Sequence, residues 1–155
     1  MKYINLIIFS LILVVIGAGI FYLINSSENC KTMKASEMNI HGHNDLVQHI
    51  HANLKISILG LDQPIPPNIG RDGDIMRPIH THDTTGKLHI ESYCLRDFKL
   101  GEFFEVWGKE FNEDCIFEHC SNDSNKLRMY VDNKENLEFG NLSLKDGDII
   151  KIVYK

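Results

Sequence analysis

Residues 79–91 are the most constrained segment of the chain, because turn formers at 83–86 separate two runs that alternate apolar and polar side chains. This pattern predicts a β-hairpin. Pairing His82 with Lys87 places His80 opposite His89. The same register collects the core-facing side chains on the opposite face: Ile79, Thr81, Leu88 and Ile90. We therefore expect the hairpin to be half-buried, with its three imidazoles as neighbours.

The rest of the domain predicts a mixed α+β fold. Residues 49–58 alternate without interruption, as a strand with one buried face does. Residues 99–108 carry apolar side chains at helical spacing and end at Gly108, which predicts a short amphipathic helix. Two further strands are expected at 126–132 and 148–154. A mostly antiparallel sheet packed on one short helix fits this order.

Histidine is concentrated near these strands, since all but one of the eight histidines lie between positions 41 and 89. Imidazole is the commonest metal ligand in proteins. The leading ligand set is His80, His82 and His89, with Glu91 two residues further along the same face. If the first strand neighbours the hairpin, one more pair joins this set: His49 and His51. The expected cofactor is a copper or zinc ion. By contrast, His41 and His43 precede the first strand and are expected to lie apart.

Two rival interpretations remain open. Histidines on the solvent face of a hairpin need no functional explanation, and the domain is then a non-enzymatic module that binds a ligand or another protein of a membrane complex. Catalysis is the weaker alternative. The sequence has no Gly-x-Ser-x-Gly elbow, no His-Glu-x-x-His helix and no phosphate-binding glycine loop.

Residues 6–24 form an apolar run of roughly 28 Å when helical, which is long enough to cross a bilayer core. The run lacks a small-residue cleavage pattern, which favours an uncleaved anchor over a removed signal. Lys2 and the free amino terminus favour the cytoplasm for the short end. We expect a transmembrane anchor at 1–25, a polar stalk at 26–48 and an extracytoplasmic domain at 49–155 of a single-pass protein in the cell membrane.

Charge and cysteine content limit the partners and the compartment. The chain has 21 acidic and 16 basic residues, a formal net charge of −5, and no basic stripe. Nucleic acid is therefore not an expected partner. The four cysteines all follow the apolar run, and an even number in an extracytoplasmic domain indicates disulfides. The short spacing favours Cys115 with Cys120, which leaves Cys30 with Cys94, although sequence alone does not fix the connectivity.

The carboxy-terminal third, from Leu100 through LRMYVD (127–132) to LKDGDIIKIVY (144–154), resembles the β-grasp modules at the carboxy terminus of transcobalamin and in soluble-ligand-binding domains. Residues 49–155 resemble an uncharacterised group of microbial membrane-anchored proteins, through IHTHDTTGKLHIES (79–92) and FKLGEFFEVWG (98–108). These resemblances imply a β-grasp-like fold and an extracytoplasmic location without an activity. The chain departs from the group at Tyr93 and Cys94, where that group is expected to have proline.

Overall fold

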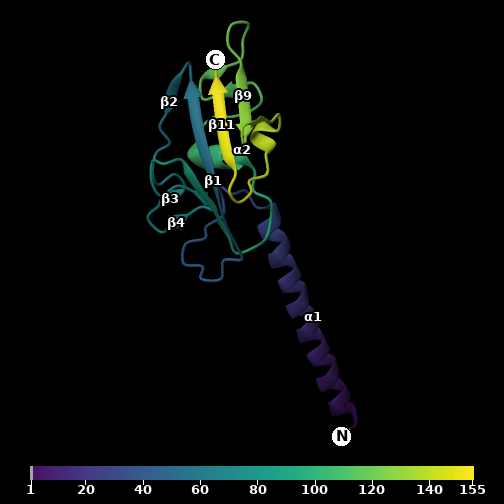
Figure 1. Cartoon of the computed structure of the whole chain (residues 1–155). Coiled ribbons are helices and arrows are strands. Elements are labelled where there is room, and N and C mark those ends of the chain that lie inside the picture. The colour runs from purple at the N-terminus through teal and green to yellow at the C-terminus, as the bar shows by residue number, and fades with distance from the viewer. Residues whose placement is uncertain (1) are drawn as a thin grey trace. The chain divides into compact units, whose positions relative to one another are not determined.

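The computed structural model describes residues 2–155, and the side chains of residues 1–7, 10 and 22–29 lie outside the description. The chain divides into two compact units, residues 1–33 and 34–155. Helix α1 (Lys2–Thr32) occupies the first unit (Figure 1). Among the described residues, no helix combines the length and the apolar character that a membrane crossing requires. The predicted span at 6–24 includes side chains outside the description, at 6, 7, 10 and 22–24.

The polar stalk expected at 26–48 is corrected by the structure, because the second unit already begins at Lys34. Ala35, Met38 and Ile40 have no solvent exposure. The backbone N–H of Ile40 donates to the carbonyl of Met76 at 2.8 Å, and the N–H of Met76 donates to the side chain of Asn39 at 3.0 Å. The sequence did not predict this packing, because these apolar residues recur with neither the period of a helix nor that of a strand. Residues 34–47 are thus part of the folded domain.

A seven-stranded sheet forms the framework of the second unit, in the order β10-β9-β11-β1-β6-β5, with β2 paired to the end of β1 (Figure 1). The strands are β1 (Gln48–Ile58), β2 (Leu61–Gln63), β5 (Ile79–His80), β6 (Lys87–Ser92), β9 (Leu127–Val131), β10 (Lys134–Glu135) and β11 (Ile149–Tyr154). Within this sheet only β1 and β11 pair in parallel. The expected α+β class and mostly antiparallel sheet are confirmed. The strands predicted at 49–58, 126–132 and 148–154 are present as β1, β9 and β11.

Short elements complete the described fold outside the large sheet. Strands β3 (Arg71–Asp72) and β4 (Ile75–Met76) form one two-stranded ribbon, and β7 (Cys115–Ile116) and β8 (His119–Cys120) form another. A 3-10 helix, η1, covers Phe139–Asn141. The first ribbon lies in the insertion between β1 and β6, which residues 59–86 form.

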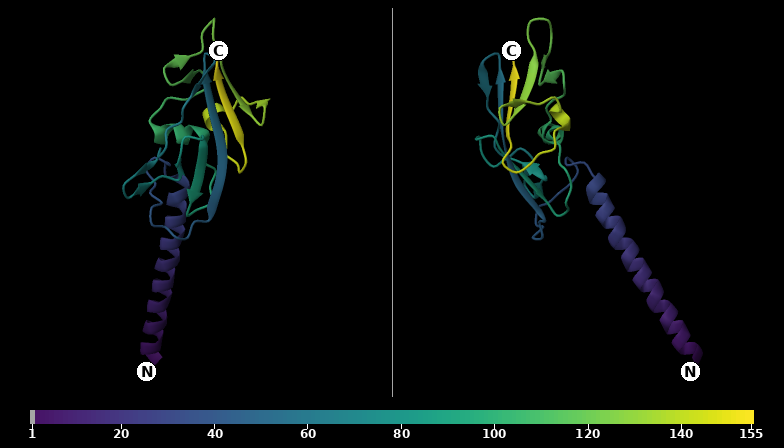
Figure 2. Two further views of the ribbon diagram at one scale, coloured as in Figure 1. Left: turned by 60° about the vertical axis from the view of Figure 1, so that its left-hand side comes forward. Right: turned by 45° about the vertical axis from the view of Figure 1, so that its right-hand side comes forward.

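Helix α2 (Leu100–Trp107) lies across one face of the sheet, as both views of Figure 2 show. Its side chains Leu100, Phe103 and Phe104 are buried, so the apolar face predicted for this helix packs into the core. Glu102 caps the helix by accepting the backbone N–H of Lys99 at 2.9 Å. The sheet contributes alternate residues to the same core: Leu54, Ile56, Leu88, Ile90, Met129, Ile150 and Ile152. The intervening side chains therefore face away from α2.

Gly86 closes the turn before β6 and fixes how closely the hairpin approaches β1. Its φ is +82°, and a Cβ atom there would collide with the carbonyl oxygen of Leu54. The backbone N–H of Leu54 donates to the carbonyl of Gly86 at 2.8 Å. Only glycine meets both requirements without strain. The turn predicted at 83–86 thus positions the histidine-bearing strand against β1.

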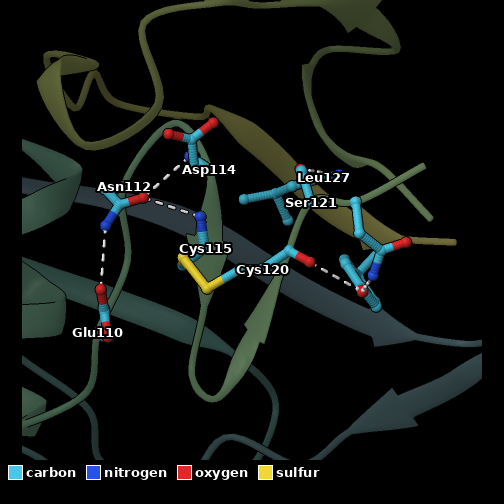
Figure 3. Close-up of a disulfide and its surroundings, with 9 residues drawn as sticks. Glu110, Asn112, Asp114, Cys115, Cys120, Ser121 and Leu127 are labelled. Carbon is cyan, nitrogen blue, oxygen red and sulfur yellow. Dashed lines mark hydrogen bonds between the residues drawn. A yellow bond between two sulfur atoms is a disulfide. The ribbon is translucent and has the colours of Figure 1, made fainter. Parts of the chain in front are cut away.

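The second ribbon carries a disulfide between Cys115 and Cys120, which face each other across β7 and β8 (Figure 3). The side chain of Asn112 accepts the backbone N–H groups of Asp114 and Cys115 at 2.9 and 2.8 Å and closes the preceding turn. Cys30 and Cys94 are also disulfide-bonded. No cysteine of the described chain is free, so thiolate ligands are not available to a metal.

Candidate metal centre

Strand register collects the histidines on the sheet face opposite α2. His51 on β1 pairs with His89 on β6, and His89 pairs with His80 on β5. The predicted opposition of His80 and His89 is confirmed. The first strand does neighbour the hairpin, and it brings His49 opposite Glu91. Three adjacent strands therefore carry one continuous group of imidazoles.

The first group is the His80 set, defined as His80, His82 and His89. Its potential ligand atoms all lie within 4.8 Å of one another. The Nε2 atoms of His80 and His82 are 3.1 Å apart. The ring of His89 lies 4.4 Å from that of His82 and 5.5 Å from that of His80, centroid to centroid. These are the leading ligands expected from the sequence, and the structure brings them together.

Hydrogen bonds fix the proton positions in this set. His80 is fully buried, and its Nδ1 lies 3.0 Å from the carbonyl oxygen of Arg77. A carbonyl only accepts, so Nδ1 carries the proton and Nε2 offers its lone pair. On His82, Nδ1 lies 3.1 Å from a guanidinium nitrogen of Arg71. Arginine only donates, so the proton of neutral His82 is on Nε2 and points at His80.

Burial keeps the inner histidines neutral. Loss of hydration lowers the pKa of His80 to about 4, and the charges of His82, His89 and Arg71 act in the same direction, against the hydrogen bond to Arg77. Burial also lowers the pKa of His89 to about 4, with smaller contributions from His82 and His51. Neutral imidazole is the form that binds metal ions. At pH 7 both side chains are thus ready to act as ligands.

The second group is the His49 set, defined as His49, His51 and His89, which again lie within 4.8 Å by their potential ligand atoms. The Nε2 atoms of His49 and His51 are 3.2 Å apart. The carboxylate of Glu91 lies 3.3 Å from His49 Nε2 and 3.9 Å from His89 Nδ1. All the metal candidates proposed from the sequence therefore lie in one continuous cluster.

The other histidines lie apart from both sets. His41 is 3.9 Å from the carboxylate of Asp74, and His43 stacks on Tyr93 at 4.6 Å between ring centroids. His119 packs beside Tyr154, at 5.4 Å between ring centroids. These three side chains provide matched controls for histidine substitutions.

Sequence reasoning missed two partners that orient the ligands, Arg71 and Arg77. Arg71 is 11 residues from His82 and reaches it from the β3–β4 ribbon. Arg77 contributes a backbone carbonyl, which depends on the path of the chain and not on the residue type. No spacing rule connects either residue to a histidine. Only the folded insertion shows these contacts.

Comparisons with protein-family models, with curated proteins and with solved structures find no match for this chain. The chemistry of the site therefore follows from its own side chains. The site offers nitrogen donors from five histidines and one carboxylate, and solvent reaches it at His49 and His82. Such a set of ligands suits a borderline transition-metal ion.

Proposed function

We propose that this protein binds a transition-metal ion, copper or zinc, on the histidine-rich face of its sheet. The observation that carries the proposal is the meeting of His80, His82 and His89 from β5, the adjoining turn and β6. Two potential ligand nitrogens 3.1 Å apart are close to the separation of about 3.3 Å expected between two ligands in a tetrahedral zinc site.

The surroundings of the His80 set support metal binding over an incidental cluster. The carbonyl of Arg77 holds the Nδ1–H of His80, which is the outer contact that commonly orients a ligating imidazole. Complete burial of the polar His80 side chain costs stability, and coordination of a bound ion would offset that cost. Copper and zinc both accept neutral imidazole.

The direct test is metal content and affinity of the full-length, disulfide-bonded chain. Zn²⁺ or Cu²⁺ is titrated calorimetrically, and bound metal is measured by elemental analysis after gel filtration. The wild type and His43→Ala should retain stoichiometric metal, whereas His82→Ala should lower the affinity for the ion held by the His80 set at least tenfold. His82 is exposed, so its substitution does not disturb the core.

Absence of bound metal in the wild type would contradict the proposal. Equal affinity of wild type and His82→Ala would show that the His80 set is not the site. Absence of metal would favour the rival interpretation, in which the sheet is a ligand- or protein-binding module of a membrane complex.

We also propose that residues 34–155 form a β-grasp-like domain. In support, β1 and β11 pair in parallel at the centre of the sheet, with β6 and β9 on their outer sides. Helix α2 follows β6 in the chain and precedes β9, and it lies across one face of the sheet (Figure 2). This arrangement is the one expected from the sequence resemblance to transcobalamin-type β-grasp modules.

We propose an extracytoplasmic location, supported by the disulfides of the described chain. Attachment to a membrane through residues 6–24 remains a prediction. Fractionation of cells with carbonate washing would test it. Recovery of the chain in the washed, soluble fraction would contradict an anchor, and a mature amino terminus after residue 26 would identify a cleaved signal.

A further inference from the structure

We propose that the histidine-rich face holds two transition-metal ions that share His89, with Nδ1 of its imidazole bound to one ion and Nε2 to the other. This inference rests on the proposed metal-binding function and extends it to a dinuclear site. The His49 set with Glu91 would hold one ion, and the remaining ligands of the His80 set would hold the second.

His89 is the one residue common to the two sets. It lies on β6, the middle of three adjacent strands, with His51 paired to it on one side and His80 on the other. Each outer strand therefore brings its histidines to a different side of the same ring. A single ion in the middle would leave the more distant ligands unused.

The direction of the His89 ring also supports two ions. Its Nδ1 lies 3.9 Å from Oε1 of Glu91, and the same oxygen lies 3.3 Å from Nε2 of His49. Nδ1 thus faces the His49 set. The lone pairs of Nδ1 and Nε2 point in widely different directions on an imidazole ring. Nε2 is therefore left for the ion held by His80 and His82.

The number and the charge of the ligands support two ions as well. Without Glu91 the His49 set offers three nitrogens, and with it a His₃-carboxylate set that suits zinc. When the second ion binds, His89 loses its remaining N–H proton to water or buffer and becomes a bridging imidazolate. The negative charges of this imidazolate and of Glu91 then offset part of the charge of two divalent ions. Exposed His49 and His82 leave room for water ligands at both positions.

The experiment is a stoichiometric titration of the full-length chain with Cu²⁺, followed by electron paramagnetic resonance. We expect two copper ions per chain. An imidazolate bridge couples the two copper spins antiferromagnetically, so the integrated signal should fall well below two spins at low temperature. Replacing one copper by Zn²⁺ should restore the signal of one isolated copper.

Three variants separate the sets. The double variant His49→Ala/His51→Ala and the single variant His82→Ala should each retain one tightly bound copper with an uncoupled signal. His89→Ala should weaken both positions, because each set then keeps two imidazoles, and should show no spin coupling. His119→Ala is the control and should behave as the wild type.

The outcomes distinguish this inference from the proposed function. One copper per wild-type chain would overturn the dinuclear site and leave the metal-binding function in place, whereas no bound copper would overturn both. Two uncoupled coppers would overturn the bridge. The wild-type stoichiometry and spin count decide the matter even if His89→Ala does not fold.

Discussion

Arg71 determines which nitrogen of His82 carries the proton. Because its guanidinium donates to Nδ1, neutral His82 keeps its proton on Nε2, the atom that faces His80. A metal ion at that position requires the proton to leave Nε2 and Arg71 to release Nδ1. The sequence predicted His82 as a candidate ligand but not this competition, because Arg71 approaches from a ribbon that no pattern connects to the hairpin.

We therefore expect Arg71→Glu to strengthen metal binding about tenfold, because a carboxylate would accept the Nδ1–H of His82 and free Nε2 for the ion. Calorimetric titration of Zn²⁺ measures this change. Arg128→Glu, the same change of charge at an exposed site on β9, is the control and should have little effect. An unchanged affinity in Arg71→Glu would show that the tautomer of His82 does not limit binding.

Buried His80 makes the stability of the metal-free protein depend on pH. Its pKa is lowered from 6.5 to about 4 on folding, so the unfolded chain binds more protons between these values. The free energy of unfolding should be highest above pH 6.5 and fall as the pH drops toward 4. A shift of this size corresponds to roughly 3 kcal/mol for His80.

Urea denaturation at pH 7.5 and pH 4.5, with a chelator present, measures this difference. His80→Gln keeps a donor for the carbonyl of Arg77 but does not titrate, so its pH dependence should be smaller than that of the wild type. An equal pH dependence in both proteins would assign the effect to other groups. Addition of Zn²⁺ at pH 7.5 should stabilise the wild type by mass action.

The elements differ in how far local sequence determined them. The turn at 83–86 joins two strands that are neighbours in the sequence, and alternation over 49–58 and 79–91 shows which side chains share a face. This was enough to predict that His80 pairs with His89. The parallel pairing of β1 with β11 joins residues far apart in sequence and has no local signal. Strand β2 was not predicted, because its three residues are too few to show an alternating pattern.

Gly86 provides a test at the level of the hairpin. Gly86→Ala should destabilise the protein by more than about 2 kcal/mol, since it combines a strained positive φ with a collision against Leu54. It should also weaken metal binding by displacing β6. The control is Gly60→Ala, where φ is +83° and no atom lies within 4 Å of the added Cβ.

Urea denaturation and metal titration measure the two effects. Because Gly60→Ala has the same backbone strain, the difference between the two variants isolates the collision with β1. Equal destabilisation by both variants would contradict the tight approach of the hairpin.

For the whole molecule, the sequence predicted the α+β class and the clustering of the candidate residues better than the extent of the domain. The candidate ligands were recognisable because all of them except His82 lie on strands with regular alternation. The start of the domain at Lys34 was not, since Ala35, Met38 and Ile40 are buried individually among polar residues. Whether apolar side chains at irregular spacing become buried depends on the surface of the folded domain against which they pack.

Removing the ribbon disulfide by Cys115→Ser/Cys120→Ser should lower the free energy of unfolding by about 2 kcal/mol, because a disulfide that closes so short a loop restricts the unfolded chain only modestly. Metal stoichiometry should stay at the wild-type value, because the ribbon carries none of the proposed ligands. Denaturation and elemental analysis of the same samples measure both. Loss of metal in this variant would indicate that the ribbon influences the histidine-rich face.

Along β1 and β6, core residues and proposed ligands occupy alternate positions of the same strands. Selection can therefore exchange one kind of ligand for another without altering the packing against α2. A histidine replaced by aspartate or methionine would change the preferred ion and leave the core intact. Insertion of a single residue in β6 would have the opposite effect, turning ligands inward and core residues outward. We expect substitutions on this face to be tolerated across evolution far more readily than changes in strand length.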